Sequence, residues 1–178
     1  MSGIVGDIDS KSRVLGNHDQ FASEWNLTSG LTGVTSDTNI TANLAERPTD
    51  TSRGYEKIGA SMTVSSGVFS FPATGLWEVS FTATGAGPQP SRENHIRIRS
   101  AIDGSTFDTS NLTSYNIPPN AGGNNHGFNC TAVILFGVDD ITTHKVIFGV
   151  QCTHSSVAFR GSTDNNATTF RFIRYGGL

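Results

Sequence analysis

The stretch from Gly67 to Gly85, GVFSFPATGLWEVSFTATG, restricts the possible folds more than any other part of the chain. Apolar and aromatic residues alternate with small or polar ones in two runs, 69–71 and 77–81. Successive side chains of a strand point to opposite faces, so this alternation predicts two strands that each bury one face. Between the runs, Pro72 fixes its own φ and Gly75 is free to adopt a positive φ, which is typical of a tight turn. The stretch predicts part of an antiparallel β-sandwich.

The composition favours the same fold class. Of the 178 residues, 35% are hydrophobic and 20 are glycine, and no window shows apolar residues recurring at helical spacing. A chain of this size, rich in small and polar residues, is typical of one domain built from short strands and generous loops. The sequence therefore predicts an all-β fold.

Charge and hydropathy exclude two classes of partner. The 12 Lys and Arg are outnumbered by 15 Asp and Glu and form no basic cluster, so we expect no nucleic-acid binding. No apolar run approaches the roughly 18 residues that a spanning helix needs, so we expect no membrane insertion. Residues 1–16 lack the apolar core of a secretory signal, which predicts a protein made in a reducing cytoplasm. We therefore expect Cys130 and Cys152 to be buried free thiols, although their spacing leaves a disulfide open.

Further alternating segments predict the remaining strands, at 40–46, 55–64, 95–102, 106–112, 129–138, 143–152 and 168–175. Three long loops, 85–94, 113–127 and 153–167, alternate along the chain with three short turns, 72–75, 103–105 and 139–141. Because consecutive antiparallel strands reverse direction, connections fall at alternate ends of a sandwich. We expect the long loops to share one end, the loop pole. The short turns and the C-terminus would share the opposite end, the turn pole.

The N-terminal part differs from the rest of the chain. Its apolar residues come in short pairs punctuated by glycine, namely Ile4, Val5, Val14 and Leu15. Such a segment cannot bury enough surface to fold alone. We therefore divide the chain into an extended arm and linker, residues 1–38, and a sandwich domain, residues 39–178. The arm is expected to order on a partner through those apolar pairs, and a plain disordered tail is the alternative.

The order of elements resembles a known family. The segments that carry the resemblance are Gly67 to Pro72, Gly75-Leu76-Trp77, Gly137 to Asp140, Phe159-Arg160-Gly161 and Thr169 to Tyr175. Together they resemble the trimeric jelly roll shared by tumour necrosis factor and the globular head of the first complement component, over roughly residues 39–178. Gly-Leu-Trp stands where that family has Gly-x-Tyr. Separately, the short glycine-punctuated start of the chain resembles virion proteins of tailed phages, marine ones in particular.

The jelly-roll resemblance implies a ten-stranded, two-sheet antiparallel sandwich that assembles as a homotrimer. We expect the trimer axis to be lined by aromatic residues, Tyr55, Phe172 and Tyr175. The alternative is that these three residues belong to the core of a single copy.

Recognition is expected at the loop pole, because rigid scaffolds commonly carry binding residues on loops. The candidate binding residues are Arg92, Asn94, Tyr115, Asn116, Asn124, His126, His154, Arg160 and Asp164. Amides with a stacking aromatic suit sugar hydroxyls and also suit the backbone of another protein. Solvated spacer loops, or contacts within a lattice of copies, are the alternative interpretation.

Catalytic motifs are missing from the sequence. It has no Gly-x-Ser-x-Gly elbow, His-Glu-x-x-His, phosphate-binding loop or Cys-x-x-Cys pair. His126 and His154 are candidates to meet at the loop pole around a metal, and Asp139-Asp140 is a candidate for calcium. Tight turns favour aspartate without any ion, however, so we expect no metal and no cofactor.

Taken together, these features predict a non-enzymatic phage virion structural protein. It would be a trimeric jelly-roll knob, a capsid decoration or head fibre, anchored to other virion proteins by its arm and assembled in the cytoplasm of a host bacterium. The alternatives are a tail-fibre tip that binds a host surface glycan, a secreted cellular ligand with the tumour necrosis factor fold, and a glycan-cleaving enzyme using loop-pole carboxylates.

Overall fold

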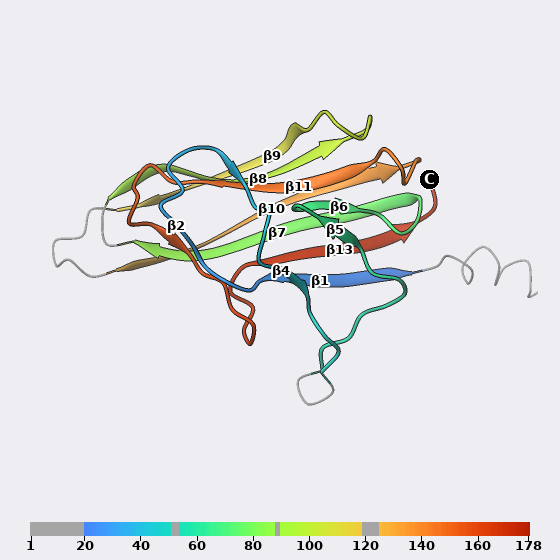
Figure 1. The fold of residues 1–178 in the computed structure, drawn as a ribbon, viewed down its shortest axis with the longest axis horizontal. Coiled ribbons are helices and arrows are strands. Elements are labelled where there is room, and N and C mark those ends of the chain that lie inside the picture. Colours follow the sequence, from blue (N-terminus) through green and yellow to red (C-terminus); the bar gives the residue numbers. More distant parts are fainter. Residues whose placement is uncertain (1–19, 51–53, 88–89, 119–124) are drawn as a thin grey trace, which may run out of the picture.

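The computed structural model describes residues 20–50, 54–87, 90–118 and 125–178. These residues form two antiparallel sheets, and none of them lies in a helix (Figure 1). The expected all-β, two-sheet antiparallel sandwich is confirmed. Within the described ranges, no helix is long and apolar enough to cross a membrane.

Sheet A contains seven strands, and its members are β1 (Phe21–Leu27), β2 (Leu31–Thr32), β4 (Leu44–Glu46), β7 (Gly75–Gly87), β10 (His126–Val138), β12 (Ala158–Phe159) and β13 (Thr169–Gly176). Sheet B contains β3 (Thr38–Asn39), β5 (Thr63–Ser65), β6 (Val68–Ser70), β8 (Ser91–Ala101), β9 (Asp108–Ile117) and β11 (Lys145–Gln151). The described residues thus hold thirteen strands instead of the ten implied by the resemblance, because β2, β3 and β12 are additional pairings of two residues each.

The aromatic stretch at residues 67–85 crosses from one sheet to the other. Phe69 lies on β6 in sheet B, while Trp77 and Phe81 lie on β7 in sheet A, and all three are buried. The Phe69 ring packs 5.0 Å from the Phe172 ring of β13 and 5.5 Å from the Phe148 ring of β11, centroid to centroid. The predicted alternation is therefore confirmed, and its inward rows form the core between the two sheets.

Two of the expected long loops are shorter in the structure, because neighbouring strands extend into them. The segment 85–94 was expected to be a loop, but β7 runs to Gly87 and β8 begins at Ser91. Glycines stand at the inward positions of this part of β7, so the sequence shows no apolar alternation there. Larger side chains would not fit, because a Cβ on Gly85 would lie 2.1 Å from Phe128 Cζ and one on Gly87 would lie 2.9 Å from Val157 Cγ2. The segment 113–127 also shortens, since β9 runs to Ile117 and β10 begins at His126.

The N-terminal boundary also differs from the expectation. Residues 21–38 were expected to be linker, but they contribute β1, β2 and the first residue of β3. β1 pairs with β13 on one side and with β4 on the other, so it lies inside sheet A. Phe21, Trp25 and Leu27 are buried, while the buried Ser23 between them interrupts the apolar alternation that would have revealed the strand. The anchor residues Ile4, Val5, Val14 and Leu15 lie outside the described residues.

The expected separation of the two poles is confirmed by the strand register. Gly75 pairs with Val138, and Ala101 pairs with Lys145, so the short turns share one end. Phe21 pairs with Arg174, which places the start of β1 and the end of β13 at this turn pole. At the opposite end, Gly87 pairs with His126 and Ser91 with Ile117. In Figure 1 the turn pole, with the C-terminus, lies on the right and the loop pole on the left.

The two edge strands β9 and β10 meet on one side of the sandwich through side chains. Asn111 of β9 donates a hydrogen bond from Nδ2 to the Val133 carbonyl oxygen of β10 (2.8 Å). Thr113 of β9 donates from Oγ1 to the Thr131 carbonyl oxygen (3.1 Å). These contacts satisfy backbone acceptors on the side of β10 where none of the described strands pairs with it.

Candidate functional site

Phe172, one of the three expected trimer-axis residues, belongs to the core of a single copy. Its side chain is fully buried on β13 between the sheets, so the expectation for Phe172 is wrong. The sequence alternation does not determine which way the Phe172 side chain points, because both faces of β13 carry some apolar residues. Tyr175, on the same strand, is 59% exposed, and its hydroxyl donates to Glu78 Oε2. Tyr55 is half-buried in the segment that follows β4, beneath the Arg47 guanidinium.

Asn94, expected to be a binding residue, is instead a buried hub that holds the loop pole together. Its Nδ2 donates to the carbonyl oxygens of Ser91 (3.0 Å) and Tyr115 (3.2 Å). Its Oδ1 accepts from the Ser91 hydroxyl and from the Thr153 amide (3.2 Å). Because its side chain is completely shielded from solvent, Asn94 has a structural role and cannot contact a ligand.

Tyr115 also turns inward rather than toward a ligand. Its ring stacks on Phe128 with centroids 3.9 Å apart, and its hydroxyl lies 3.7 Å from Cys152 Sγ. Burial raises the pKa of Tyr115 well above its usual value, so the hydroxyl stays protonated. The residue closes the core beneath the loop pole, which corrects its expected role in binding.

The other expected binding residues form a loose polar surface. Arg92, Asn116, Arg160 and Asp164 are exposed, and His126 and His154 are half-buried. Asn124 lies outside the described residues. His154 accepts a hydrogen bond at Nδ1 from its neighbour Ser156, and the described residues contain no group of three side chains placed to hold a metal ion.

The turn at Asp139-Asp140 uses both carboxylates internally. Asp140 Oδ1 accepts from the Thr142 amide (2.7 Å) and hydroxyl (2.6 Å), which lower the pKa of Asp140. Asp139 Oδ1 lies 3.2 Å from Nε2 of the buried His144. These contacts are those of an aspartate-stabilised turn.

The two cysteines are free and buried. Burial raises the pKa of the Cys130 thiol to about 12, and it raises the pKa of the Cys152 thiol as well. A thiol of such high pKa is a poor nucleophile at neutral pH, because only the thiolate attacks.

The outward face of sheet A carries a row of mostly apolar residues. Leu135 of β10 pairs with Glu78 of β7, Glu78 with Ile173 of β13, and Ile173 with Ala22 of β1. Ala22 in turn forms a β-bridge with Ile58. Leu135 is 64% exposed and Ile58 is 51% exposed, so a row that crosses five chain segments meets solvent. We call it the apolar row.

The single charged member of the apolar row, Glu78, accepts a hydrogen bond from a neighbouring side chain. The Tyr175 hydroxyl donates to Glu78, and this hydrogen bond raises the pKa of Tyr175. Leu178 is 75% exposed, and its side chain lies near Gly137 on the same face of β10. Apolar surface of this kind on an otherwise polar protein is typical of a contact face.

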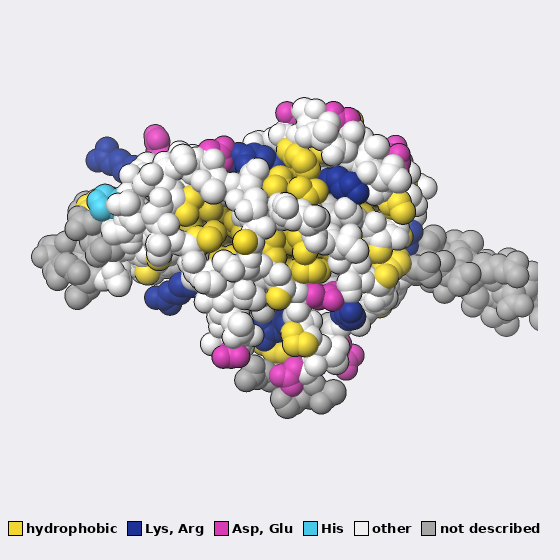
Figure 2. Space-filling model, in the orientation of Figure 1, with side chains coloured by type: hydrophobic (Ala, Val, Ile, Leu, Met, Phe, Trp, Pro, Cys, Tyr) yellow, Lys and Arg dark blue, Asp and Glu magenta, His cyan; other side chains and the backbone are white. Residues whose placement is uncertain are grey.

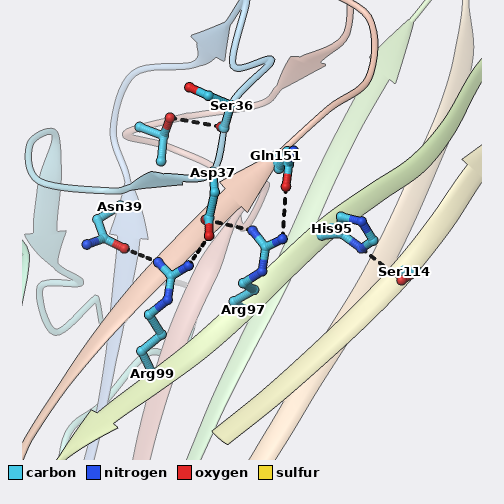
Figure 3. Close-up of polar contacts among 9 residues, drawn as sticks. Ser36, Asp37, Asn39, His95, Arg97, Arg99, Ser114 and Gln151 are labelled. Carbon is cyan, nitrogen blue, oxygen red and sulfur yellow. Dashed lines mark hydrogen bonds and ion pairs between the residues drawn. The ribbon is translucent and has the colours of Figure 1, made fainter. Parts of the chain in front are cut away.

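The outward face of sheet B carries an arginine cluster that sequence reasoning missed (Figure 3). Arg97 and Arg99 of β8 share Asp37: Arg97 Nη1 lies 2.6 Å from Oδ1, and Arg99 Nη2 contacts Oδ2. Arg97 Nη2 donates to Gln151 Oε1 (2.8 Å), and Arg99 Nη1 donates to Asn39 Oδ1. Since every Nη atom has a protein partner, the cluster ties the chain around β3 to sheet B and offers little to a ligand.

On the face seen in Figure 2, positive and negative side chains are interspersed, and hydrophobic side chains lie in separate groups among polar ones. This face therefore shows no large patch of one sign. Such a distribution does not suit a polyanion such as nucleic acid.

A pocket opens at the β1 side of the outward face of sheet A. It has a volume of about 380 Å³ and lies between β1 and β13 on one side and segment 54–57 on the other, with Arg47 and Asn166 in its walls. Its residues come from five separated parts of the chain, so no local sequence signal could have shown the pocket.

Comparisons with known proteins support the fold alone. The sequence matches no family model and no curated protein. The structure is similar to murine APRIL, with a TM-score of 0.53 and 8% identity over 87% of this chain and 98% of that one. It is also similar to Eiger TNF from S. frugiperda, with a TM-score of 0.58 and 9% identity over 90% of this chain and 95% of that one. The resemblance to the tumour necrosis factor jelly roll is thereby confirmed at the level of the fold.

Proposed function

We propose that this chain is a non-enzymatic structural module of a virion, a homotrimeric jelly-roll knob attached through the arm that precedes β1. The observation that carries the proposal is the separation of the poles. β1 begins at the turn pole beside the end of β13, while the remaining loops gather at the opposite end. A tether at the turn pole therefore directs the loop pole outward from the surface to which the protein is attached.

The outward face of sheet A supports self-association. The apolar row and Tyr175 place several large, half-exposed or exposed side chains on one side of the sandwich. Covering such a face with identical copies removes apolar surface from water, and closed symmetry limits the assembly to a defined number of copies. Three is the number that the jelly-roll resemblance implies.

The non-enzymatic part of the proposal rests on the state of the reactive groups. The two thiols are buried and protonated at neutral pH, and the carboxylates of the 139–140 turn are engaged within the turn. At the loop pole, Asn94 and Tyr115 serve the interior. Thiols, carboxylates and loop-pole side chains that are engaged inside the protein are consistent with a structural role.

The homotrimer is tested by light scattering coupled to size-exclusion chromatography. We expect three times the chain mass of 18.9 kDa for the wild type and a monomer for Leu135→Asp, which puts a charge into the apolar row. Ile102→Asp is the matched control, because Ile102 is similarly exposed (68%) but follows β8 of sheet B. A monomeric wild type, or equal dissociation of both variants, would contradict the proposal.

The tether is tested on particles. Deleting residues 1–19 should leave a soluble trimer that no longer incorporates into virions, as seen by electron microscopy of particles assembled with the truncated chain. Normal incorporation would show that attachment lies elsewhere. Competition of host adsorption by the purified domain then separates a tail-fibre tip, which should block adsorption, from a capsid decoration, which should not.

A further inference from the structure

Exposed apolar side chains lie on the two turns that meet at the turn pole. Ile102, directly after β8, is 68% exposed, and Ile141, in the turn before β11, is 41% exposed. The two turns touch, because a Cβ on Gly104 would lie 3.7 Å from Thr143 Cα. In Figure 1 both turns lie at the right-hand end of the molecule, as does the start of β1. We call this surface the turn-pole surface and define it as residues 102–108 and 139–145.

The turn-pole surface is acidic as well as apolar. It carries one lysine and four exposed aspartates, Asp103, Asp108, Asp139 and Asp140. Hydrogen bonds from Thr106 and Ser105 hold the pKa of Asp103 well below its usual value, so this carboxylate is charged at neutral pH. The Lys145 ammonium is engaged within the surface, because its Nζ donates to the Ile141 carbonyl oxygen (3.1 Å). A partner that suits this surface brings apolar side chains together with cations.

The arm of the same chain contains a segment with this chemistry. Residues 10–16, Ser-Lys-Ser-Arg-Val-Leu-Gly, place Lys11 and Arg13 next to the apolar pair Val14 and Leu15. The three aspartates of the arm all lie outside this segment. Opposite charges favour the encounter and orient such a contact, while burial of the apolar side chains stabilises it.

The connection between this segment and the domain is long enough to reach the turn-pole surface of the same copy. Phe21 begins β1 at the turn pole, and the six residue steps from Leu15 to Phe21 span at most about 20 Å. β1 and β11 both pack on one aromatic ring, since Phe69 lies 5.2 Å from Trp25 of β1 and 5.5 Å from Phe148 of β11. The sheets of a sandwich lie about 10 Å apart, so the turn before β11 is within reach of the arm.

We propose that residues 11–15 of the arm dock on the turn-pole surface of their own copy. The apolar pair of this segment covers the two isoleucines of the surface, and Lys11 and Arg13 lie against the surrounding aspartates. The contact fixes the direction in which residues 1–10 leave the domain. The inference goes beyond the proposed function, because both sides of the contact belong to this chain and neither a trimer nor a virion is needed for it.

Trypsin cleavage of the full chain tests the docking, because the bond after Arg13 must leave the surface before a protease can cut it. Cleavage at this bond, followed by mass spectrometry, should be at least about tenfold faster in Ile102→Asp/Ile141→Asp than in the wild type. The arm has the same sequence in both proteins, so the intrinsic susceptibility of the bond does not change. Leu112→Asp is the matched control, since Leu112 is 45% exposed but lies in the middle of β9, and it should be cleaved at the wild-type rate.

Methyl NMR of the isoleucines provides a readout that needs no substitution in the domain. The Ile102 and Ile141 methyl resonances of the full chain should differ from those of a chain that lacks residues 1–19. The Ile117 resonances, at the loop pole, should be the same in both proteins. The arm-dependent difference should persist in Leu135→Asp, because the contact lies within one copy.

Substitutions in the arm then separate its two apolar pairs. Val14→Asp/Leu15→Asp should give the spectrum of the truncated chain at the two isoleucines of the turn-pole surface. Ile4→Asp/Val5→Asp, which adds the same charge to the other pair, should leave that part of the spectrum unchanged.

Four results would overturn the proposal. They are equal trypsin cleavage of wild type and double variant, isoleucine resonances that do not respond to the arm, equal effects of the two arm variants, and loss of the arm-dependent difference in Leu135→Asp. Resonances that move with protein concentration instead of with the arm would show that another copy covers the turn pole, which also contradicts the proposal. Because all these measurements use the isolated protein, failure of the docking and failure of the virion role can be told apart.

Discussion

Replacing Asn94 by alanine should loosen the loop pole without touching the central aromatic core. The alanine leaves three backbone groups without their partner: the carbonyl oxygens of Ser91 and Tyr115 and the amide of Thr153. A buried group left unsatisfied costs roughly 1–3 kcal/mol, and because water can reach two of these part-buried bonds, we expect a total loss of about 3 kcal/mol. The Ser91 hydroxyl adds little, since it can turn to Thr153 Oγ1 (2.8 Å).

The assay is urea unfolding at one fixed protein concentration, because association shifts the apparent stability of any oligomer. Asn116→Ala is the matched control: Asn116 is exposed, and its Oδ1 accepts one bond, from the Glu93 amide (3.1 Å). That variant should lose less than about 1 kcal/mol. Hydrogen exchange should also speed up at the Thr153 amide in Asn94→Ala. Equal losses for the two variants would refute the role of Asn94 as a buried hub.

Three further outcomes follow from local geometry. Gly67→Ala should lower the free energy of unfolding by more than about 1 kcal/mol, and by more than Gly104→Ala does. Both glycines have positive φ, but a Cβ at Gly67 would lie 2.1 Å from the Ile40 carbonyl oxygen, whereas Gly104 has no such close contact. Thermal melting of the two variants compares the losses. Cys130 and Cys152 should react with a thiol reagent at pH 8 slowly in the folded protein and rapidly in denaturant, because burial raises both pKa values and keeps the thiolate scarce; fast labelling of the folded protein would contradict this. Asp140 has a lowered pKa, so its contribution to stability is present above about pH 4 and is lost as the pH falls below that value; the melting temperatures of wild type and Asp140→Ala should therefore converge in acid.

The sequence predicted strands correctly where large apolar side chains alternate with polar ones. It missed strand residues where the inward positions are glycine or where most side chains are polar. The alternation around Phe69 and Trp77 is visible because those rings fill the core. The extension of β7 toward the loop pole could not be seen in the sequence, since the inward space beside Gly85 and Gly87 is occupied by the Phe128 ring and by Val157. β9 is an edge strand with mostly polar side chains, so its second half resembled a loop.

The candidate site was less predictable, because composition does not reveal which polar side chains face inward. Asn94 and Tyr115 have the chemistry of binding residues, yet a β-bulge in β8 and the stacking on Phe128 turn both of them inside. Conversely, Arg47 and Glu24 carry no local motif, and they meet only because β1 and β4 are paired. Pairings between distant segments decide these roles, and a single sequence does not display them.

The hydrogen bonds from Asn111 and Thr113 to the edge of β10 affect how closely copies of this protein can be placed side by side. A strand from a neighbouring molecule that docked on β10 would compete for the carbonyl oxygens already taken by Asn111 and Thr113. Crowded copies are thereby discouraged from zipping into an amyloid-like ribbon.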